Sequence, residues 1–95
     1  MTEPLPALRV VVAWSARRNL CSIISDALAE LAGAEEVRPL GEESFVVNTS
    51  LAAAELRDHL RSRLAQGDAV FVADFEVWSA HGANVDATWL LRRGH

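Results

Sequence analysis

The sequence lacks the features that mark exported, disulfide-bonded or membrane-spanning proteins. Its 95 residues include one cysteine, Cys21, which cannot form an internal disulfide, and no Cys/His cluster has zinc-binding spacing. No run of apolar residues approaches the length of about 20 that a membrane-spanning helix needs. The first six residues carry neither the basic segment nor the apolar run of a signal peptide. We therefore expect a cytoplasmic protein in a reducing compartment, with no membrane partner.

Clustered positive charge is also scarce. The chain has 9 basic and 13 acidic side chains and a net charge of −4, so its overall field repels nucleic acid. The only adjacent arginines are Arg17 with Arg18 and Arg92 with Arg93. In a dimer these could form a phosphate-binding ridge, because a guanidinium group binds phosphate through two parallel donors. A solvated surface is the favoured interpretation, and nucleic acid is a disfavoured partner.

Sequence motifs for nucleotide or acyl chemistry are missing as well. There is no GxGxxG, P-loop or nucleophile elbow, and no Ser/His/Asp or Cys/His arrangement can be assembled. His81 lies in the small-residue loop 79–84, where an imidazole could transfer protons near neutral pH. A solvated loop histidine is favoured, and Cys21 is favoured as a small core residue. The sequence leans against an enzyme and predicts no cofactor.

Apolar residues are plentiful and their spacing predicts four strands. They make up 51% of the chain, which is enough for one core in a single domain. Residues 8–14 form a β-branched run typical of a buried central strand, and residues 69–78 form a second apolar strand that would pair with it. Residues 35–40 and 44–49 predict a hairpin around a turn at 41–43. Pro39 suits an edge strand because it lacks a backbone donor.

Helical spacing of apolar residues predicts two helices between these strands. The first would begin after Ser15 or Asn19 as its cap and end at Gly33. The second would begin at Ser50 and end at Gly67. Each carries one apolar stripe, formed in the first by Leu20, Ile23, Ile24, Ala27, Leu28 and Leu31 and in the second by Ala53, Leu56, Leu60 and Leu64.

The resulting order is strand, helix, strand, strand, helix, strand. We predict a single α/β domain over residues 1–95, an α+β sandwich of ferredoxin-like β-α-β-β-α-β layout with an extended N-terminus at 1–7 and a C-terminal extension at 79–95. Right-handed crossovers place both helices on one face of the sheet, although residues 70–75 are apolar on both faces. A second copy of the chain would cover the other face.

The C-terminal extension contains a last apolar segment, residues 85–91, which has no place in the basic layout. We expect a short fifth strand or a helical turn that docks across a dimer interface. Tryptophan is enriched at interfaces, and a packing or dimer role is favoured here over base stacking. The predicted interface residues are Trp78, Trp89, Leu90 and Leu91.

Residues 43–91 resemble the small SinR-like proteins, which are distantly similar to the second CRISPR-associated protein family and to VapD. The resemblance rests on Phe-Val-Val-Asn-Thr-Ser at 45–50, the helix at 56–64, the strand at 67–72 and Trp-Leu-Leu at 89–91. It implies a ferredoxin-like subunit that dimerises through sheet faces or edges, with a C-terminal segment that joins the partner's sheet. The CRISPR-associated family has a proposed metal-binding aspartate at the end of the first strand, where residues 12–15 here contain none.

Asp74 is the main carboxylate candidate for chemistry, because an unpaired charge within an apolar strand is costly to bury. It would act as a metal ligand or general base, but pairing with an arginine at a sheet end or dimer seam is favoured. Three functions therefore stay open. The first is a non-catalytic homodimeric module, a degenerate relative of the nuclease-like family. The others are a Mg²⁺-dependent nuclease or ribonuclease toxin using Asp74, Asp68 or Asp86, and a small-molecule-binding regulatory domain.

Overall fold

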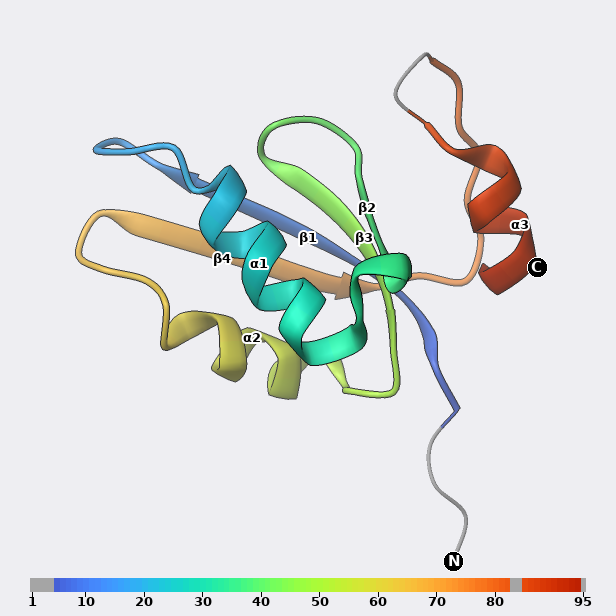
Figure 1. The fold of residues 1–95 in the computed structure, drawn as a ribbon, viewed down its shortest axis with the longest axis horizontal. Helices are drawn as coiled ribbons and strands as arrows, with labels where there is room; N and C mark the ends of the chain where they lie inside the picture. The colour runs from blue at the N-terminus through green and yellow to red at the C-terminus, as the bar shows by residue number, and fades with distance from the viewer. Residues whose placement is uncertain (1–4, 83–84, 95) are drawn as a thin grey trace, which may run out of the picture.

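The computed structural model describes residues 5–82 and 85–94, which fold into four strands and three α-helices (Figure 1). The predicted β-α-β-β-α-β order is present, and a further helix follows it. The elements are β1 (Ala7–Ser15), α1 (Cys21–Ala32), a short 3-10 turn η1 (Ala34–Glu36), β2 (Val37–Pro39), β3 (Ser44–Thr49), α2 (Ala53–Arg61), β4 (Asp68–Asp74) and α3 (Ala87–Gly94).

The strands form one antiparallel sheet in the order β2-β3-β1-β4. β1 lies inside the sheet, where Val10 pairs with Val46 of β3 and with Ala73 of β4. The predicted pairing of the first and last strands is confirmed, with β4 at an edge of the sheet. Helices α1 and α2 lie on the same face of the sheet (Figure 1). The predicted α/β sandwich is therefore confirmed.

The larger core lies between the sheet and this helix pair. The apolar stripe of α1 is buried there at Ile24, Ala27 and Leu28, and α2 contributes Leu56 and Leu60. The strands supply the opposite wall with Val11, Ala13, Val37, Phe45 and Val47. The helical spacing in the sequence thus identified the buried stripes of both helices.

The ends of the helices differ from the predictions in detail. The backbone N–H of Cys21 donates to Asn19 Oδ1 at 2.7 Å, so Asn19 rather than Ser15 serves the start of α1. The second helix begins after Ala52 and not at Ser50, because the Glu55 carboxylate accepts a bond from the Ala52 N–H at 3.1 Å. It ends at Arg61, well before Gly67.

The last predicted strand is also shorter than expected. β4 stops at Asp74, and the chain then leaves the sheet edge so that Phe75 and Trp78 pack over the face away from α1 and α2. The C-terminal segment is a helix, α3, and so the helical alternative is the correct one. Within the described residues, no helix is long and apolar enough to cross a membrane.

Candidate functional site: the open face of the sheet

The sheet face away from α1 and α2, here called the open face, is apolar as well. Side chains alternate along a strand, so Val11 and Ala13 of β1 point into the helix-covered core while Val10, Val12 and Trp14 point to the open face. On β4, Phe71 and Ala73 share this face, and Val46 of β3 adds to it. A face of this composition needs a cover.

Helix α3 covers one end of the open face. Trp89 and Leu90 are 4% and 5% exposed and form a second buried cluster with Leu8 and Val46. This places two of the four predicted interface residues against the chain's own sheet. Leu91 points outward and is 61% exposed.

Polar contacts around Trp89 hold α3 in place. Its indole N–H donates to the Glu35 carbonyl at 2.7 Å, and its backbone N–H donates to Asp86 Oδ1 at 3.0 Å. That backbone donor lowers the pKa of Asp86 below its usual value. The Arg93 guanidinium lies 4.7 Å from the indole centroid and bonds both Glu36 carboxylate oxygens at 3.0 and 3.1 Å, which lowers the pKa of Glu36.

The other end of the open face has no cover within the described chain. Trp14 is 45% exposed and Phe71 is 55% exposed. The register brings them together, since Val12 pairs with Phe71 and Trp14 pairs with Ala69. None of these four side chains ionises. We call Val12, Trp14, Ala69 and Phe71 the uncovered patch.

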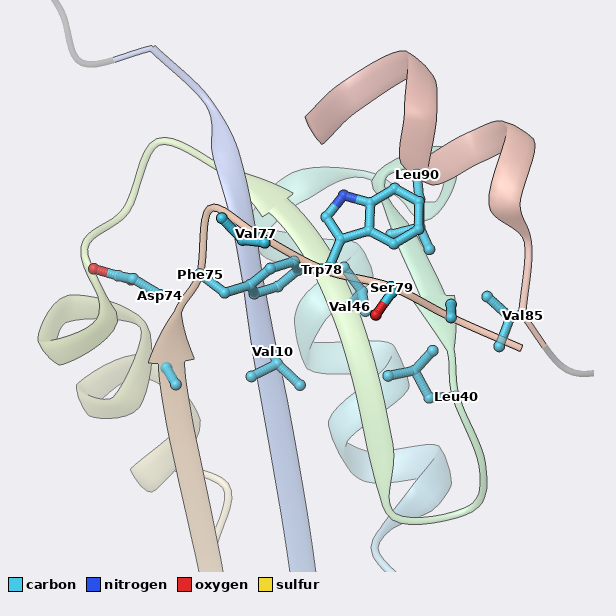
Figure 2. Close-up of a pocket in the computed structure, with 12 residues that line it drawn as sticks. Val10, Leu40, Val46, Asp74, Phe75, Val77, Trp78, Ser79, Val85 and Leu90 are labelled. Atoms are coloured by element: carbon cyan, nitrogen blue, oxygen red, sulfur yellow. The ribbon is translucent and has the colours of Figure 1, made fainter. Parts of the chain in front are cut away.

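A groove of about 440 Å³ lies between this patch and α3. Its floor is the open face, and the segment after β4 crosses above β1 and β3 to form its roof (Figure 2). Its volume falls in the range of about 300–1,000 Å³ typical of small-molecule sites. Its lining includes two polar residues, Asp74 and Ser79, and the apolar lining includes Val10, Val46, Ala73, Phe75, Trp78 and Leu90.

Asp74 lies at the rim of this groove and is paired. Its Oδ1 is 2.8 Å from Arg9 Nε, and its side chain is 61% exposed. Figure 2 shows the carboxylate pointing away from the groove. The arginine pairing favoured from the sequence is therefore present, at the end of β4.

Asp68, at the other end of β4, is also hydrogen-bonded within the chain. Its carboxylate accepts from Arg18 Nε at 3.1 Å and from the Ala65 N–H at 2.8 Å. The Arg18 bonds, with smaller contributions from Ser15 and Ala65, hold the pKa of Asp68 far below its usual range. Asp68 and Asp74 are separated by the length of β4, about 20 Å, which is too far for one metal ion to bridge.

The third carboxylate proposed for metal binding, Asp86, caps α3 and lies 3.4 Å from Arg38 Nε. The three candidates are thus distributed over three places in the fold. Among residues 5–82 and 85–94, no group of three or more His, Cys, Asp or Glu side chains is positioned to hold a metal ion.

The two arginine pairs do not meet within one chain. Arg17 and Arg18 follow β1 at one end of the molecule, and Arg92 and Arg93 lie on α3 at the opposite end (Figure 1). Arg18 bonds Asp68 and Arg93 bonds Glu36, whereas the side chains of Arg17 and Arg92 are exposed. A continuous phosphate-binding ridge is not formed in the single chain.

The remaining candidates take unremarkable positions. His81 is exposed in the loop between β4 and α3. Cys21 is the first residue of α1 and packs at the edge of the larger core, as the favoured interpretation expected. Trp78 is half-buried over the groove.

The uncovered patch and the groove were missed as a site from the sequence. Trp14 ends the apolar run 8–14, which predicts a strand but no binding surface. Val10, Val12 and Trp14 are alternate residues of β1, and Phe71 and Ala73 are alternate residues of β4, so the sequence indicates that each set shares one face of its strand. Only the pairing register shows that the two sets adjoin.

Three comparisons with known proteins give no relative. No protein-family model, no curated protein and no solved structure matches the chain.

Proposed function

We propose that the chain is a non-catalytic interaction module that forms a homodimer through the uncovered half of its open face. The supporting observation is the uncovered patch, in which two aromatic side chains at the uncovered end of the open face are about half exposed. Phe and Trp each bury about 150–250 Å² when fully covered, and contiguous apolar surface of this kind marks interaction sites. A second copy covers this surface on both subunits at once.

Charge favours this face over the rest of the surface. Each copy carries a net charge of −4, so two copies repel one another through most relative orientations. The uncovered patch itself contains no ionisable side chain. Contact through the patch therefore buries apolar area without burying an unpaired charge.

The experiment is sedimentation velocity on the unmodified chain and on Phe71→Ser. Phe71 points outward, so the substitution removes apolar area from the patch without opening the helix-covered core. We expect the variant to dissociate at concentrations where the unmodified chain is dimeric. Leu5→Ser is the matched control, because Leu5 is 84% exposed and lies outside the patch. A monomeric unmodified chain at tens of micromolar would reject the proposal.

On this proposal, the resemblance to the SinR-like, CRISPR-associated and VapD proteins is one of fold and assembly. The paired state of Asp68, Asp74 and Asp86 supports a non-catalytic role. The metal-dependent nuclease alternative is tested by incubating RNA and DNA with the protein and Mg²⁺ or Mn²⁺. Cleavage that needs the metal and disappears in Asp74→Asn would establish the nuclease and overturn the proposal.

A second candidate function is binding of a small apolar molecule, and the groove of about 440 Å³ is the observation that favours it. Its lining is apolar, with Ser79 as a hydrogen-bonding group on the roof (Figure 2). A panel of apolar metabolites would then raise the melting temperature of the unmodified chain, and Ala73→Trp, which fills the groove, would abolish the shift. The absence of any such shift would reject this candidate.

A further inference from the structure

We infer that Trp14 of each copy inserts into the groove of the other copy. This inference rests on the proposed homodimer and names the residue and the cavity that join its two subunits. It assigns Trp14 as the side chain that enters and the space over Val10, Val46 and Ala73 as the site that receives it.

Trp14 and the groove lie on the same face of the same strand. Trp14, Val12 and Val10 occupy alternate positions of β1, so their side chains share the open face, and Val10 forms part of the groove floor. Four residues of a strand separate Trp14 from Val10, which is about 13 Å. The exposed indole and the groove are therefore two features of one continuous apolar surface.

A twofold axis turns this separation into self-complementarity. If the axis lies between two facing sheets and runs across the strands at the level of Val12, it reverses the direction of β1 in the second copy. Trp14 of each subunit then lies over Val10 and Ala73 of the other. Both contacts form together, as an isologous interface requires.

The groove suits an indole in size and in chemistry. Its volume of about 440 Å³ is ample for one ring system, and its wall includes Phe75 and Trp78, which offer aromatic contacts. A buried indole N–H needs an acceptor. Ser79 of the crossing segment lines the groove, and its hydroxyl oxygen can accept that bond.

The area that a dimer requires also favours insertion over flat contact. Four strands spaced by about 4.8 Å and about seven residues long give a sheet face of roughly 450 Å². A standard stable interface buries about 800 Å² on each partner, so the flat face alone would give a smaller and weaker contact than most stable dimers have. Insertion of Trp14 adds the groove walls and both faces of the indole to the buried area. The interface thus gains a central aromatic anchor of the kind that dominates binding energy.

The test uses two variants that break the same contact from opposite sides. Trp14→Ala removes the inserted side chain but leaves the groove open. Ala73→Trp fills the groove but keeps Trp14. Each variant alone loses both insertions of the symmetric dimer, and we expect dimerisation to weaken by about 30-fold or more. A mixture of the two retains one insertion, from Trp14 of the filled copy into the open groove of the other.

The expected result is therefore rescue on mixing. Native mass spectrometry and sedimentation of the equimolar mixture should show the mixed dimer at concentrations where each variant alone is monomeric. Ser79→Trp, on the crossing segment and outside β4, replaces Ala73→Trp if circular dichroism shows that the latter is unfolded. Rescue by the mixture identifies insertion into the partner's groove, since a contact of Trp14 with its own symmetry mate would not be restored.

The outcomes separate this inference from the proposal beneath it. Weakened dimers with no rescue on mixing would overturn the insertion of Trp14 and leave the open-face dimer standing. Dimers of unchanged affinity in both variants would overturn the insertion and would show that the interface lies on another surface of the chain. A monomeric unmodified chain would overturn the proposed homodimer itself.

Discussion

The two faces of the sheet are covered to different extents. On one face, α1 and α2 cover Val11, Phe45 and Val47 completely. On the other, α3 covers only the end at Leu8 and Val46, and Trp14 and Phe71 stay about half exposed. Both faces are apolar, so composition does not distinguish them. The helix-covered face therefore supplies most of the core of the single chain, while the open face keeps apolar area exposed.

Two phenylalanines give the sharpest way to test this comparison. Phe45 is 2% exposed in the helix-covered core, so Phe45→Ala should lower the free energy of unfolding by about 3–5 kcal/mol through lost burial and a cavity. Phe71→Ala, on the 55% exposed side, should cost far less in the monomer. Urea unfolding, at a protein concentration below the dimer dissociation constant, measures the free energy of unfolding of both variants. Equal losses would show that the two faces do not differ in role.

The next prediction concerns the cover supplied by α3. Trp89→Ala removes the buried indole, its bond to the Glu35 carbonyl and its contact with Arg93. We expect a loss of about 2–4 kcal/mol and fast hydrogen exchange over residues 87–94, with the strands still protected.

Leu91→Ala is the control for that change, because it lies on the same helix with its side chain outward. It should leave both stability and exchange nearly unchanged. Loss of protection throughout the sheet in Trp89→Ala would contradict a cover limited to one end of the open face.

The free energy of unfolding should depend on pH through Asp68. This first residue of β4 accepts hydrogen bonds from Arg18, which follows β1. Its folded-state pKa is depressed by the Arg18 bonds, so the stability it contributes is fully present above its unfolded value of about 3.9 and is lost as the pH falls toward the folded value. Unfolding curves should therefore shift to lower denaturant concentration below about pH 4. Asp68→Asn should be less stable at neutral pH and show a weaker shift.

The smallest expected effect is at Asp74, on the rim of the open face. Its pair with Arg9 is largely exposed on the carboxylate side, and such pairs contribute about 0.2–1 kcal/mol. Asp74→Asn should therefore change the free energy of unfolding by no more than this, as measured by urea titration. A much larger stabilisation in Asp74→Asn would reveal a carboxylate held at a cost, as functional sites hold them.

Much of this fold could be predicted from local patterns. The β-branched run of β1 and the apolar stripe of α1 each specify an element and its buried side, and Gly33 ends α1 with a φ of +96° as expected. The ends of α2 and β4 could not be predicted so well. Leu64 keeps helical spacing, yet the helix ends where the Ser62 hydroxyl donates to the His59 carbonyl at 2.7 Å.

The site was harder to predict because it depends on tertiary contacts. Asp86, three residues before Trp89, was an available sign that a helix begins there. The groove, however, exists only because the chain after β4 turns over Val10 and Val46, and no local pattern encodes that path. The pairing of Val12 with Phe71, which makes the uncovered patch contiguous, likewise depends on the sheet register.

Sedimentation equilibrium of the unmodified chain decides whether the open face forms a dimer interface. The uncovered patch predicts a mass twice that of one chain at tens of micromolar, with dissociation on dilution. A single species with the mass of one chain over that whole range would contradict the claim.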